Sequence, residues 1–337
     1  MKLAEINTIN EIKPIEGADK IELARVEGWQ SVVKRGEFNV GDRIVFIPID
    51  TVLQPAVWNS FLHDKSDPTK PIRVKTVKLR GTISQGLIFP LTILPDPFFE
   101  HEIGTDVADL IGVTKYEKPI PVQLMGQVKG NFPSHLVSKT DEDNLKSNIK
   151  VLDELREADE VEATLKVDGT SATYIKELDG TFHVCSRNME LKDTEDNVYW
   201  QMARKYNIEE NLKAGFAIQG EISGPSIQGN PAGCDAVSLV VFNVIDLSTR
   251  KPLARTNWDS AITGVQKVLV WRTFTKEEFA SKDIDYLQDY VNKLKYSTNK
   301  SPVEGLVFRG IKNGEIMYSH KLQKMLSVKI INQNYRD

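Results

Sequence analysis

Residues 166–171, Lys-Val-Asp-Gly-Thr-Ser, bring a lysine, an acid and a glycine together directly after a strand-like run. Residues 161–165 alternate apolar and polar side chains, which predicts a half-buried strand ending at Lys166. Gly169 would let the backbone turn sharply or approach a ligand closely. A lysine presented in this way can attack an electrophilic phosphorus atom if its amine is neutral at that moment. The same pattern also fits an exposed turn, so the interpretation depends on the segments that follow.

Four later segments carry polar residues at the ends of, or within, predicted strands. A Ser-Arg-Asn turn ends one strand, a Gly-Glu pair follows an apolar run, an aromatic residue lies inside an apolar strand, and a Glu-Gly pair opens another. In chain order these segments are 186–188 after 181–185, 220–224 after 216–218, 240–246, and 304–309. Each is unremarkable alone, but their order is informative.

Together with residues 166–171, these segments resemble the motifs of covalent nucleotidyltransferases, which include RNA ligases, DNA ligases and mRNA capping enzymes. The resemblance implies that Lys166 accepts the nucleotidyl group. It assigns nucleotide binding to the following further residues: Leu165, Gly169, Arg187, Glu221, Phe242, Glu304, Lys324 and Lys329. In the family the aromatic residue at the position of Phe242 stacks on adenine, and the arginine at that of Arg187 touches the nucleotide or the RNA end.

The last family motif, a strand with Lys-x-Lys, is altered in this chain. Lys329 fits the second lysine and is expected to act in catalysis beside Lys166, but Ser327 occupies the first position. Lys324 or Lys321 could supply the missing charge if the strand register were shifted.

The expected chemistry requires positive charge near Lys166. A free lysine has a pKa of about 10.4, and lowering it to 7 requires on the order of 4–5 kcal/mol. A divalent cation could supply this, with Arg187 and Lys329 in support. The resemblance implies that Asp168, Glu221 and Glu304 hold hydrated Mg²⁺ or Mn²⁺ beside the α-phosphate of ATP, since Mg²⁺ retains several waters. A second metal ion assisted by an N-terminal acid such as Asp19 is a further expectation.

Composition is that of an ordinary globular protein, with 337 residues, 40% hydrophobic and 27% charged, and a net charge of −4. No apolar run is long enough to span a membrane, and Cys185 and Cys234 lack metal-like spacing, so we expect a cytoplasmic protein with reduced thiols. Because phosphate binding depends on local charge, residues 73–81, with four basic side chains, are the candidate RNA-binding patch. A solvated edge strand guarded by lysines is the alternative.

The predicted fold class is α+β, with an N-terminal OB-like β-barrel in residues 1–120 and a nucleotidyltransferase domain of antiparallel sheets flanked by helices in residues 121–337. Short strands with Gly-Asp turns near 36–42 indicate the barrel. This domain order resembles the two-domain nick-sealing RNA ligases of the Deinococcus and Naegleria type. Residues 125–133 read as a loop.

Helices are expected at three places in the second domain. One begins near Thr140 as N-cap and places Leu145, Ile149, Leu152 and Leu155 on one face; the others lie near 195–206 and 283–296.

The predicted function is therefore ATP-dependent joining of RNA 3′-OH and 5′-phosphate ends, at nicks in duplexes, through a lysine–AMP intermediate, by a monomer. The alternatives are a DNA ligase or another covalent nucleotidyltransferase, and an OB-type nucleic-acid-binding protein whose catalytic domain is inactive. Capping is disfavoured because few residues follow Lys329.

Overall fold

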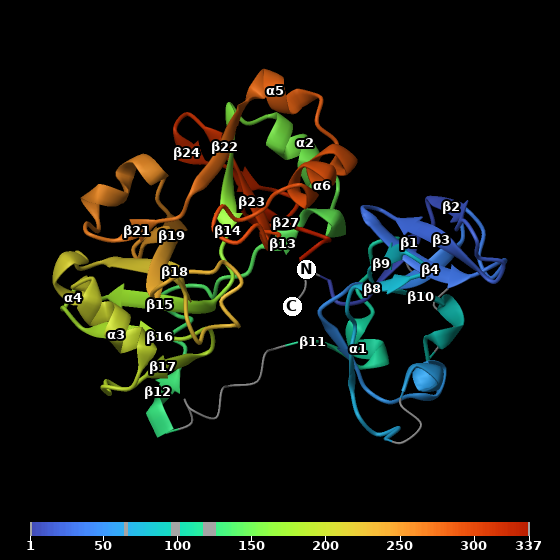
Figure 1. Cartoon of the computed structure of the whole chain (residues 1–337), viewed down its shortest axis with the longest axis horizontal. Coiled ribbons are helices and arrows are strands. Elements are labelled where there is room, and N and C mark those ends of the chain that lie inside the picture. The colour runs from blue at the N-terminus through green and yellow to red at the C-terminus, as the bar shows by residue number, and fades with distance from the viewer. Residues whose placement is uncertain (1, 64–66, 96–101, 117–125, 336–337) are drawn as a thin grey trace. The chain divides into compact units, whose positions relative to one another are not determined.

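The structure, a computed structural model, describes residues 2–63, 67–95, 102–116 and 126–335. Its contacts divide the chain into two compact units (Figure 1). Unit 1 comprises Met1–Pro119 together with Lys146–Ile149, and unit 2 comprises Ile120–Leu145 together with Lys150–Asp337. Among the described residues, no helix is both long and apolar enough to cross a lipid bilayer.

Unit 1 consists of short strands in small antiparallel sheets. The sheets are β1 (Glu5–Thr8), β5 (Arg43–Ile47) and β10 (Leu87–Pro90); β2 (Glu11–Pro14), β3 (Ile21–Val26) and β4 (Trp29–Lys34); β6 (Thr51–Leu53), β7 (Ile72–Arg73) and β11 (Val113–Lys115); and the hairpin β8 (Val77–Leu79) and β9 (Thr82–Ser84). Short helical turns connect them: η1 (Val57–Leu62), η2 (Leu91–Ile93) and α1 (Ala108–Ile111).

Strand β5 is buried on both faces and supplies two hydrophobic clusters. Val45 and Ile47 pack in one cluster, whereas Ile44 and Phe46 pack in the other. This division follows from the two-residue period of a strand, which points successive side chains to opposite faces. Short strands are expected around the turns near 36–42, and β4 and β5 flank that segment.

The basic segment 73–81 is divided between β7 and the β8–β9 hairpin, so it does not form one regular strand. Arg73 binds Asp50 (Nη2–Oδ1 2.7 Å) and stacks over Tyr116. Lys75, Lys78 and Arg80 are exposed. Ile72 and Arg73 pair with Leu53 and Val52 of β6, and the chain turns at Arg80, which has φ 49°. The basic side chains of this segment therefore do not alternate between the two faces of a single strand.

Unit 2 contains two larger sheets. The eight-stranded sheet consists of β12 (Val128–Asn131), β17 (Met189–Leu191), β16 (Phe182–Cys185), β15 (Thr170–Lys176), β18 (Phe216–Ser223), β19 (Ser238–Asp246), β20 (Lys251–Pro252) and β21 (Gln266–Lys267). The six-stranded sheet consists of β13 (Asp143–Asn144), β27 (Ser327–Ile331), β23 (Gly305–Lys312), β14 (Glu160–Lys166), β22 (Val270–Thr275) and β24 (Glu315–Ile316). Pairing is antiparallel except for β13–β27 and β19–β21. A short pair, β25 (Tyr318–Ser319) and β26 (Lys324–Met325), precedes β27.

Helices flank both sheets of unit 2, as predicted (Figure 1). They are α2 (Val151–Arg156), α3 (Val198–Lys205), α4 (Ile208–Asn211), α5 (Lys276–Ala280) and α6 (Ile284–Asn292), with the turns η4 (Leu145–Ser147) and η5 (Arg255–Ser260). The helices predicted near 195–206 and 283–296 correspond to α3 and α6, which are capped by Asn197 and Asp283.

Two expectations for the start of the second domain are wrong. The helix does not begin near Thr140, because residues 143–144 pair with β27 and only Val151–Arg156 is α-helical. Thr140 does not cap a helix; its hydroxyl lies 3.0 Å from that of Ser171. In segment 125–133, residue 125 lies outside the described residues, and Val128–Asn131 is a strand rather than a loop because it pairs with β17.

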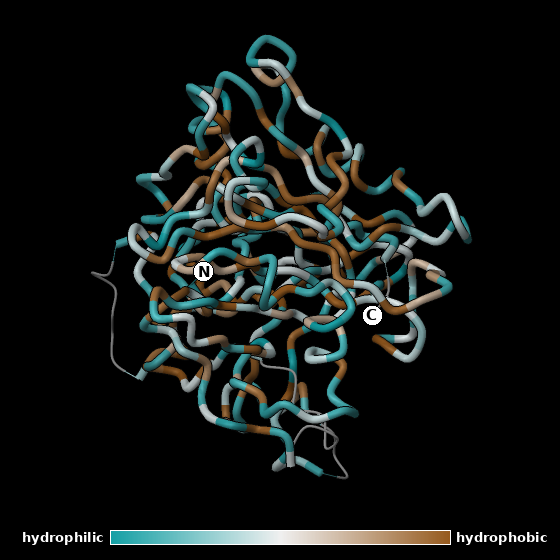
Figure 2. The backbone as a smooth tube through the Cα atoms, turned by 90° about the vertical axis from the view of Figure 1, so that its left-hand side faces the viewer, coloured by the Kyte–Doolittle hydropathy of each residue, from teal (hydrophilic) through white to brown (hydrophobic). Residues whose placement is uncertain are grey.

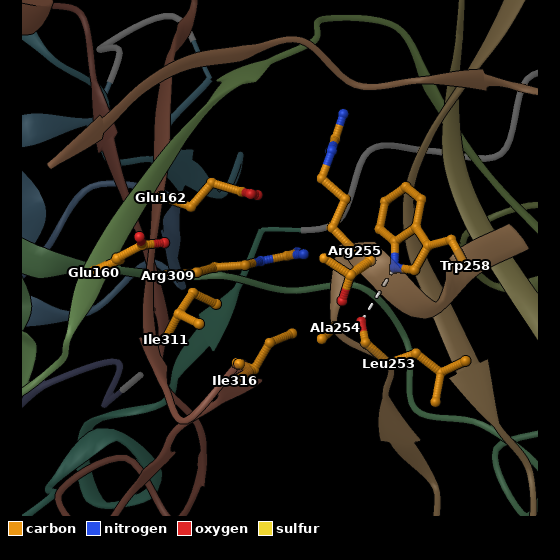
Figure 3. A pocket seen from close by; sticks show the side chains of 11 residues that line it. Glu160, Glu162, Leu253, Ala254, Arg255, Trp258, Arg309, Ile311 and Ile316 are labelled. Atoms are coloured by element: carbon orange, nitrogen blue, oxygen red, sulfur yellow. Dashed lines mark hydrogen bonds between the residues drawn. The ribbon is translucent and has the colours of Figure 1, made fainter. Parts of the chain in front are cut away.

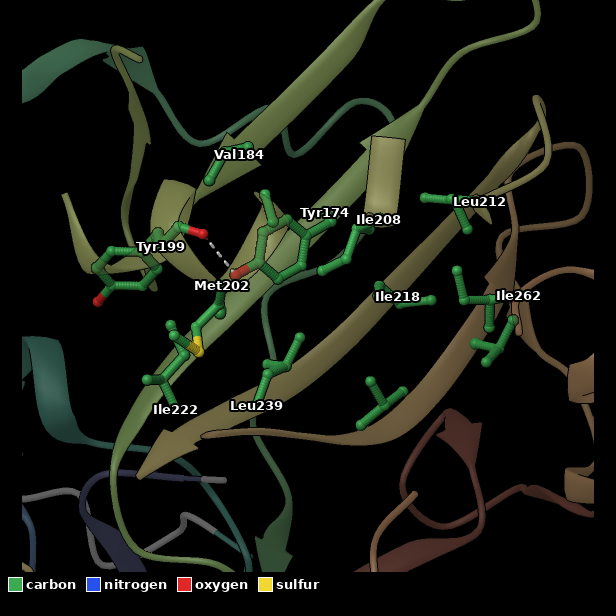
Figure 4. Close-up of a cluster of buried hydrophobic side chains, with 14 of the residues drawn as sticks. Tyr174, Val184, Tyr199, Met202, Ile208, Leu212, Ile218, Ile222, Leu239 and Ile262 are labelled. Atoms are coloured by element: carbon green, nitrogen blue, oxygen red, sulfur yellow. Dashed lines mark hydrogen bonds between the residues drawn. The ribbon is translucent and has the colours of Figure 1, made fainter. Parts of the chain in front are cut away.

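The outer face of the larger sheet packs against α3 and α4 in a cluster of buried side chains (Figure 4). Tyr174, Ile218 and Leu239 from the sheet meet Met202 and Ile208 from the helices. The one polar atom of Tyr174 is satisfied, because its hydroxyl donates to the Tyr199 carbonyl over 2.9 Å. Figure 2 shows hydrophobic segments along the interior strands and hydrophilic loops at the periphery. This core holds β15, β18 and β19 rigidly, so their opposite face can position a site.

Candidate active site

Lys166 is the last residue of β14 and lies beside the start of β23, where it pairs with Gly305 in the register. Its Nζ is 2.5 Å from Oε1 of Glu304, the residue that precedes β23. The side chains are 27% and 14% exposed, so solvent reaches the amine but does not surround it. The two motif residues therefore meet because two neighbouring antiparallel strands bring their ends together.

Gly169 brings the second sheet to this point. A Cβ on Gly169 would lie 2.2 Å from the Ile222 carbonyl oxygen, too close for any side chain, and 3.0 Å from Cγ of Glu221. The glycine therefore permits close approach to β18 rather than a positive φ. In β15, Ser171 pairs with Glu221, so the turn that contains Asp168 lies at the end of β18 that carries this acid.

Three carboxylates raise the pKa of Lys166. Burial alone would lower it, but the charges of Glu304, Glu221 and Asp168 and the hydrogen bond that Lys166 donates to Glu304 outweigh that effect. Burial also raises the pKa of Glu304, with Asp168 adding to the rise and Lys166 and Lys329 opposing it. We take the ammonium as the form of Lys166 in this state, since three acids face it. The amine becomes a nucleophile only when other positive charge offsets them.

Glu304 Oε2 marks the position where such charge fits. This oxygen is buried and forms no hydrogen bond within the described residues, and the hydroxyl of Tyr296 is in the same condition. Burial, followed by the charges of Glu304 and Asp168, raises the pKa of Tyr296 to about 12. In the described ranges no group of three or more His, Cys, Asp or Glu side chains has the spacing of direct metal ligands. The acids fit a cation that keeps its waters, because waters reach oxygens that a bare ion would not.

Tyr335 is a second phenol at this site. Its hydroxyl donates a hydrogen bond to Oδ2 of Asp168, and burial together with that hydrogen bond raises the Tyr335 pKa well above its usual value. Sequence reasoning missed Tyr296 and Tyr335. Neither lies in a recognisable motif, so only the folded chain reveals their proximity to the acids.

The lysines of the last motif divide into two groups. Lys329 pairs with Val307 in the register, and its charge acts on Glu304, so it lies at the site. Lys324 instead donates to the Asp141 carbonyl and binds Asp143 (Nζ–Oδ2 2.9 Å). Lys321 donates to the Lys150 carbonyl beside α2. Neither lysine contacts Ser327 through these bonds.

Other residues singled out from the sequence have simpler surroundings. Arg187 is exposed in the turn between β16 and β17, and Asp19 is exposed in unit 1. Leu165 pairs with Leu306, and its N–H donates to the Leu269 carbonyl over 2.9 Å. Phe242 is half-buried in β19.

The main residue that sequence reasoning left without a role is Arg309. It lies at the end of the recognised Glu-Gly segment, yet its side chain is only 8% exposed and connects the two sheets. A buried arginine on a strand is unusual, because such a charge needs several partners. Its two-residue spacing from Val307 was the available signal for the face it occupies.

Comparison with known proteins agrees with this geometry. An OB-fold domain model matches residues 3–91, and an RNA ligase model matches residues 159–322. No curated protein sequence matches the chain significantly. The OB-fold match, with the sheets described above, confirms the predicted fold class.

Solved structures of an RNA ligase from Naegleria gruberi are similar over nearly the whole chain. The ligase with PPi is 31% identical, with a TM-score of 0.82, and the match covers 98% of this chain and 97% of that one. A variant with ATP and Mn is 31% identical, with a TM-score of 0.81 and coverage of 99% and 98%. A variant with AMP and Mn is 30% identical, with a TM-score of 0.83 and coverage of 98% and 97%. With identity at this level over the full length of both chains, and with an acid cluster around a strand-end lysine, the chain belongs to the RNA ligases.

Proposed function

We propose that this RNA ligase uses ATP and a divalent cation to join RNA 3′-OH and 5′-phosphate ends, at nicks in duplexes, through a Lys166–AMP intermediate. The observation that carries the proposal is the pairing of Lys166 with Glu304 over 2.5 Å, with Asp168 and Glu221 acting on the same amine. The related ligase, observed with ATP and Mn and with AMP and Mn, supports this choice of nucleotide and metal.

In the first step the neutral amine of Lys166 attacks the α-phosphorus of ATP. A nitrogen–phosphorus bond forms, the bond to the β-phosphate oxygen breaks, and pyrophosphate leaves. Lys329 faces Glu304 from the neighbouring strand, and we assign it to the charge of the α-phosphate. Preorganised cations of this kind stabilise charge that develops in the transition state.

In the second step an oxygen of the RNA 5′-phosphate attacks the same phosphorus, and the bond to Lys166 breaks. AMP is then joined to the RNA through a pyrophosphate linkage. In the third step the 3′-hydroxyl attacks the RNA phosphorus, a phosphodiester forms and AMP leaves. Each step moves charge about one phosphorus, so positioning by the same residues serves all three.

We assign Asp168, Glu221 and Glu304 to a hydrated Mg²⁺ or Mn²⁺. The orphaned Oε2 of Glu304 fits this role, because a metal-bound water would donate to it. When bound, the cation would lower the Lys166 pKa and offset the charge of the phosphates. Lys324, which is occupied by Asp143, is not part of the nucleotide site in this proposal. Arg187, Phe242, Leu165 and Gly169 remain assigned to nucleotide binding.

We propose that residues 1–120 form a nucleic-acid-binding domain and residues 121–337 the adenylyltransferase domain. The OB-fold match over residues 3–91 and the exposed cations Lys75, Lys78 and Arg80 support the first assignment. Lysines and arginines at an exposed turn supply sequence-independent binding to phosphates.

The test is incubation of the full chain with α-labelled ATP or GTP and Mg²⁺ or Mn²⁺. We expect covalent label from ATP in the wild type and none in Lys166→Ala. When a nicked duplex is added, the label should leave the protein as AMP while the nick is sealed. Label from GTP alone would point to another nucleotidyltransferase activity, and absence of label with every nucleotide and metal would sink the proposal.

A further inference from the structure

Arg309 is a buried cation with a full set of partners in both sheets of unit 2. It lies in β23 opposite Ser327 of β27. Its Nε donates to Ser327 Oγ (3.1 Å) and its Nη1 to the Phe242 carbonyl (2.9 Å). Its Nη2 donates to Asn243 Oδ1 (2.6 Å) and lies 3.6 Å from Glu142 Oε1. The planar guanidinium, with donors in a rigid fork, suits several fixed acceptors better than a lysine would.

The contact at Phe242 coincides with an irregularity in the sheet. In the pairing of β18 with β19, Gln219 opposes Asn243 and Gly220 opposes Val241, so Phe242 is an extra residue without a partner in the register. A bulge of this kind disrupts the hydrogen-bond ladder and changes the direction of a side chain. Val241 and Val244 lie in the buried cluster on the outer face, whereas Phe242 is half-buried. Arg309 satisfies the carbonyl at this bulge.

The adjacent amide is held from both ends. Asn243 accepts from Arg309 and donates from Nδ2 to Gln219 Oε1 over 3.0 Å, and Gln219 Nε2 donates to the Ser138 carbonyl over 2.8 Å. Gln219 is 2% exposed. The bulge therefore has few orientations open to it, because a fully satisfied buried network fixes its members.

The same geometry accounts for Ser327. Its hydroxyl accepts from Arg309, and the residue is 7% exposed. A lysine here would bring an ammonium against the guanidinium with no acceptor for Arg309 Nε. A serine at position 327 therefore suits a buried Arg309 better than a lysine would.

We propose that Arg309 is a positioning residue for the nucleotide: it fixes the Phe242 bulge, and with it the ring that packs on the adenine base, and Ser327 is the partner that allows it to do so. This inference rests on the proposed function. Arg309 does not touch the reacting atoms; it acts through Phe242. Its removal should weaken ATP binding more than it slows the chemical step.

The experiment measures KM for ATP and kcat for Lys166–AMP formation in the full chain. Arg309→Met is compared with Arg255→Met, since both arginines line the same cavity of about 150 Å³ (Figure 3). Arg255 donates to the Val268 carbonyl and stacks over Trp258. We expect KM for ATP to rise about 10- to 100-fold in Arg309→Met, with kcat changed less than about threefold, and neither value to change in Arg255→Met.

Two further variants keep the test decisive if Arg309→Met does not fold. Arg309→Lys keeps the charge but not the fork, and should raise KM at least about fivefold relative to Arg255→Lys. Ser327→Lys, which restores the family pattern, should also raise KM because it displaces Arg309. An unchanged KM in Arg309→Lys, or improved ATP use in Ser327→Lys, would overturn the inference. If the wild type forms no label at all, the proposed function fails, which is a different result.

Discussion

Lys166 and Arg309 are cations on the neighbouring strands β14 and β23, but their surroundings are opposite. Lys166 faces three carboxylates, and one of their oxygens has no hydrogen bond to any residue that the structure describes. Arg309 faces three neutral oxygens and a single carboxylate, and its donors are occupied. An excess of negative charge with an orphaned oxygen is a site that requires another cation, whereas a satisfied network holds structure. The contrast separates chemistry from support within one pair of sheets.

The largest effect is expected when Lys166 is replaced. Lys166→Met should lower the rate of covalent labelling by ATP at least about 1,000-fold, or about 4 kcal/mol, since no other amine can accept AMP. The free energy of unfolding should change by less than about 1 kcal/mol, because the raised pKa of Glu304 lets it take a proton instead. Labelling assays and urea denaturation check both values. If the free energy of unfolding fell by as much as the activation free energy of labelling rose, Lys166 would have a structural role.

The second prediction concerns the replacement of Arg309. Arg309→Met should lower the free energy of unfolding by about 3 kcal/mol, because Glu142, Asn243 and the Phe242 carbonyl lose their partner. Chemical denaturation at fixed pH measures it, and Arg255→Met is the matched control, with an expected loss of about 1 kcal/mol. A difference of less than 1 kcal/mol between the two variants would remove the distinction drawn above.

Glu304→Gln sharpens the comparison at the active site. It keeps the shape of the side chain but removes one negative charge, so we expect labelling to slow about 100-fold, or about 2.7 kcal/mol. Raising the Mn²⁺ concentration should restore part of the rate if the loss is in metal binding. Glu162→Gln, on the neighbouring strand β14, provides the control and should label normally. Similar rates for both variants would exclude Glu304 from metal binding.

The smallest effect concerns Lys324 and Asp143, an ion pair that includes neither of the two compared cations. Burial alone would raise the Asp143 pKa, but Lys324 lowers it below the usual 3.8. A lowered folded-state pKa stabilises the fold above the unfolded value and loses that contribution as pH falls through the folded value. Lys324→Met should therefore cost about 0.5–1 kcal/mol above pH 5, discounted for solvent screening, and less below pH 4. Denaturation at several pH values measures the difference, which should not grow in acid.

Much of the site could be predicted because its residues lie in strands with regular patterns. The alternation before Lys166 and the Glu-Gly segment at 304–305 specify two strand ends, and the structure pairs them. Gly169 allows the strand with the Gly-Glu pair to come close, and the sequence already indicated that a glycine here permits a close approach of the backbone. These features depend on local pattern, to which short segments respond consistently.

Features that depend on distant pairing could not be predicted. Residues 143–144 form a strand only because β27 offers an edge, although their neighbours favour a helix. The bulge at Phe242 arises from the register of two strands, and no local residue type announces it. Arg309, Tyr296 and Tyr335 acquire meaning from partners far along the chain. Tertiary contacts decide such cases over local propensity.

The discontinuous composition of unit 1 has a practical consequence for dissecting the enzyme. Residues 146–149 belong with Met1–Pro119, and within that unit Lys146 is 5% exposed and donates to Gln85 over 3.0 Å. A shortened protein that starts after residue 119 would retain this four-residue insertion while losing the surface that shelters its ammonium. Such a fragment would expose the Lys146 ammonium, one residue beyond Leu145. Removal of the N-terminal part would therefore change the surface of the remaining domain as well as shorten the chain.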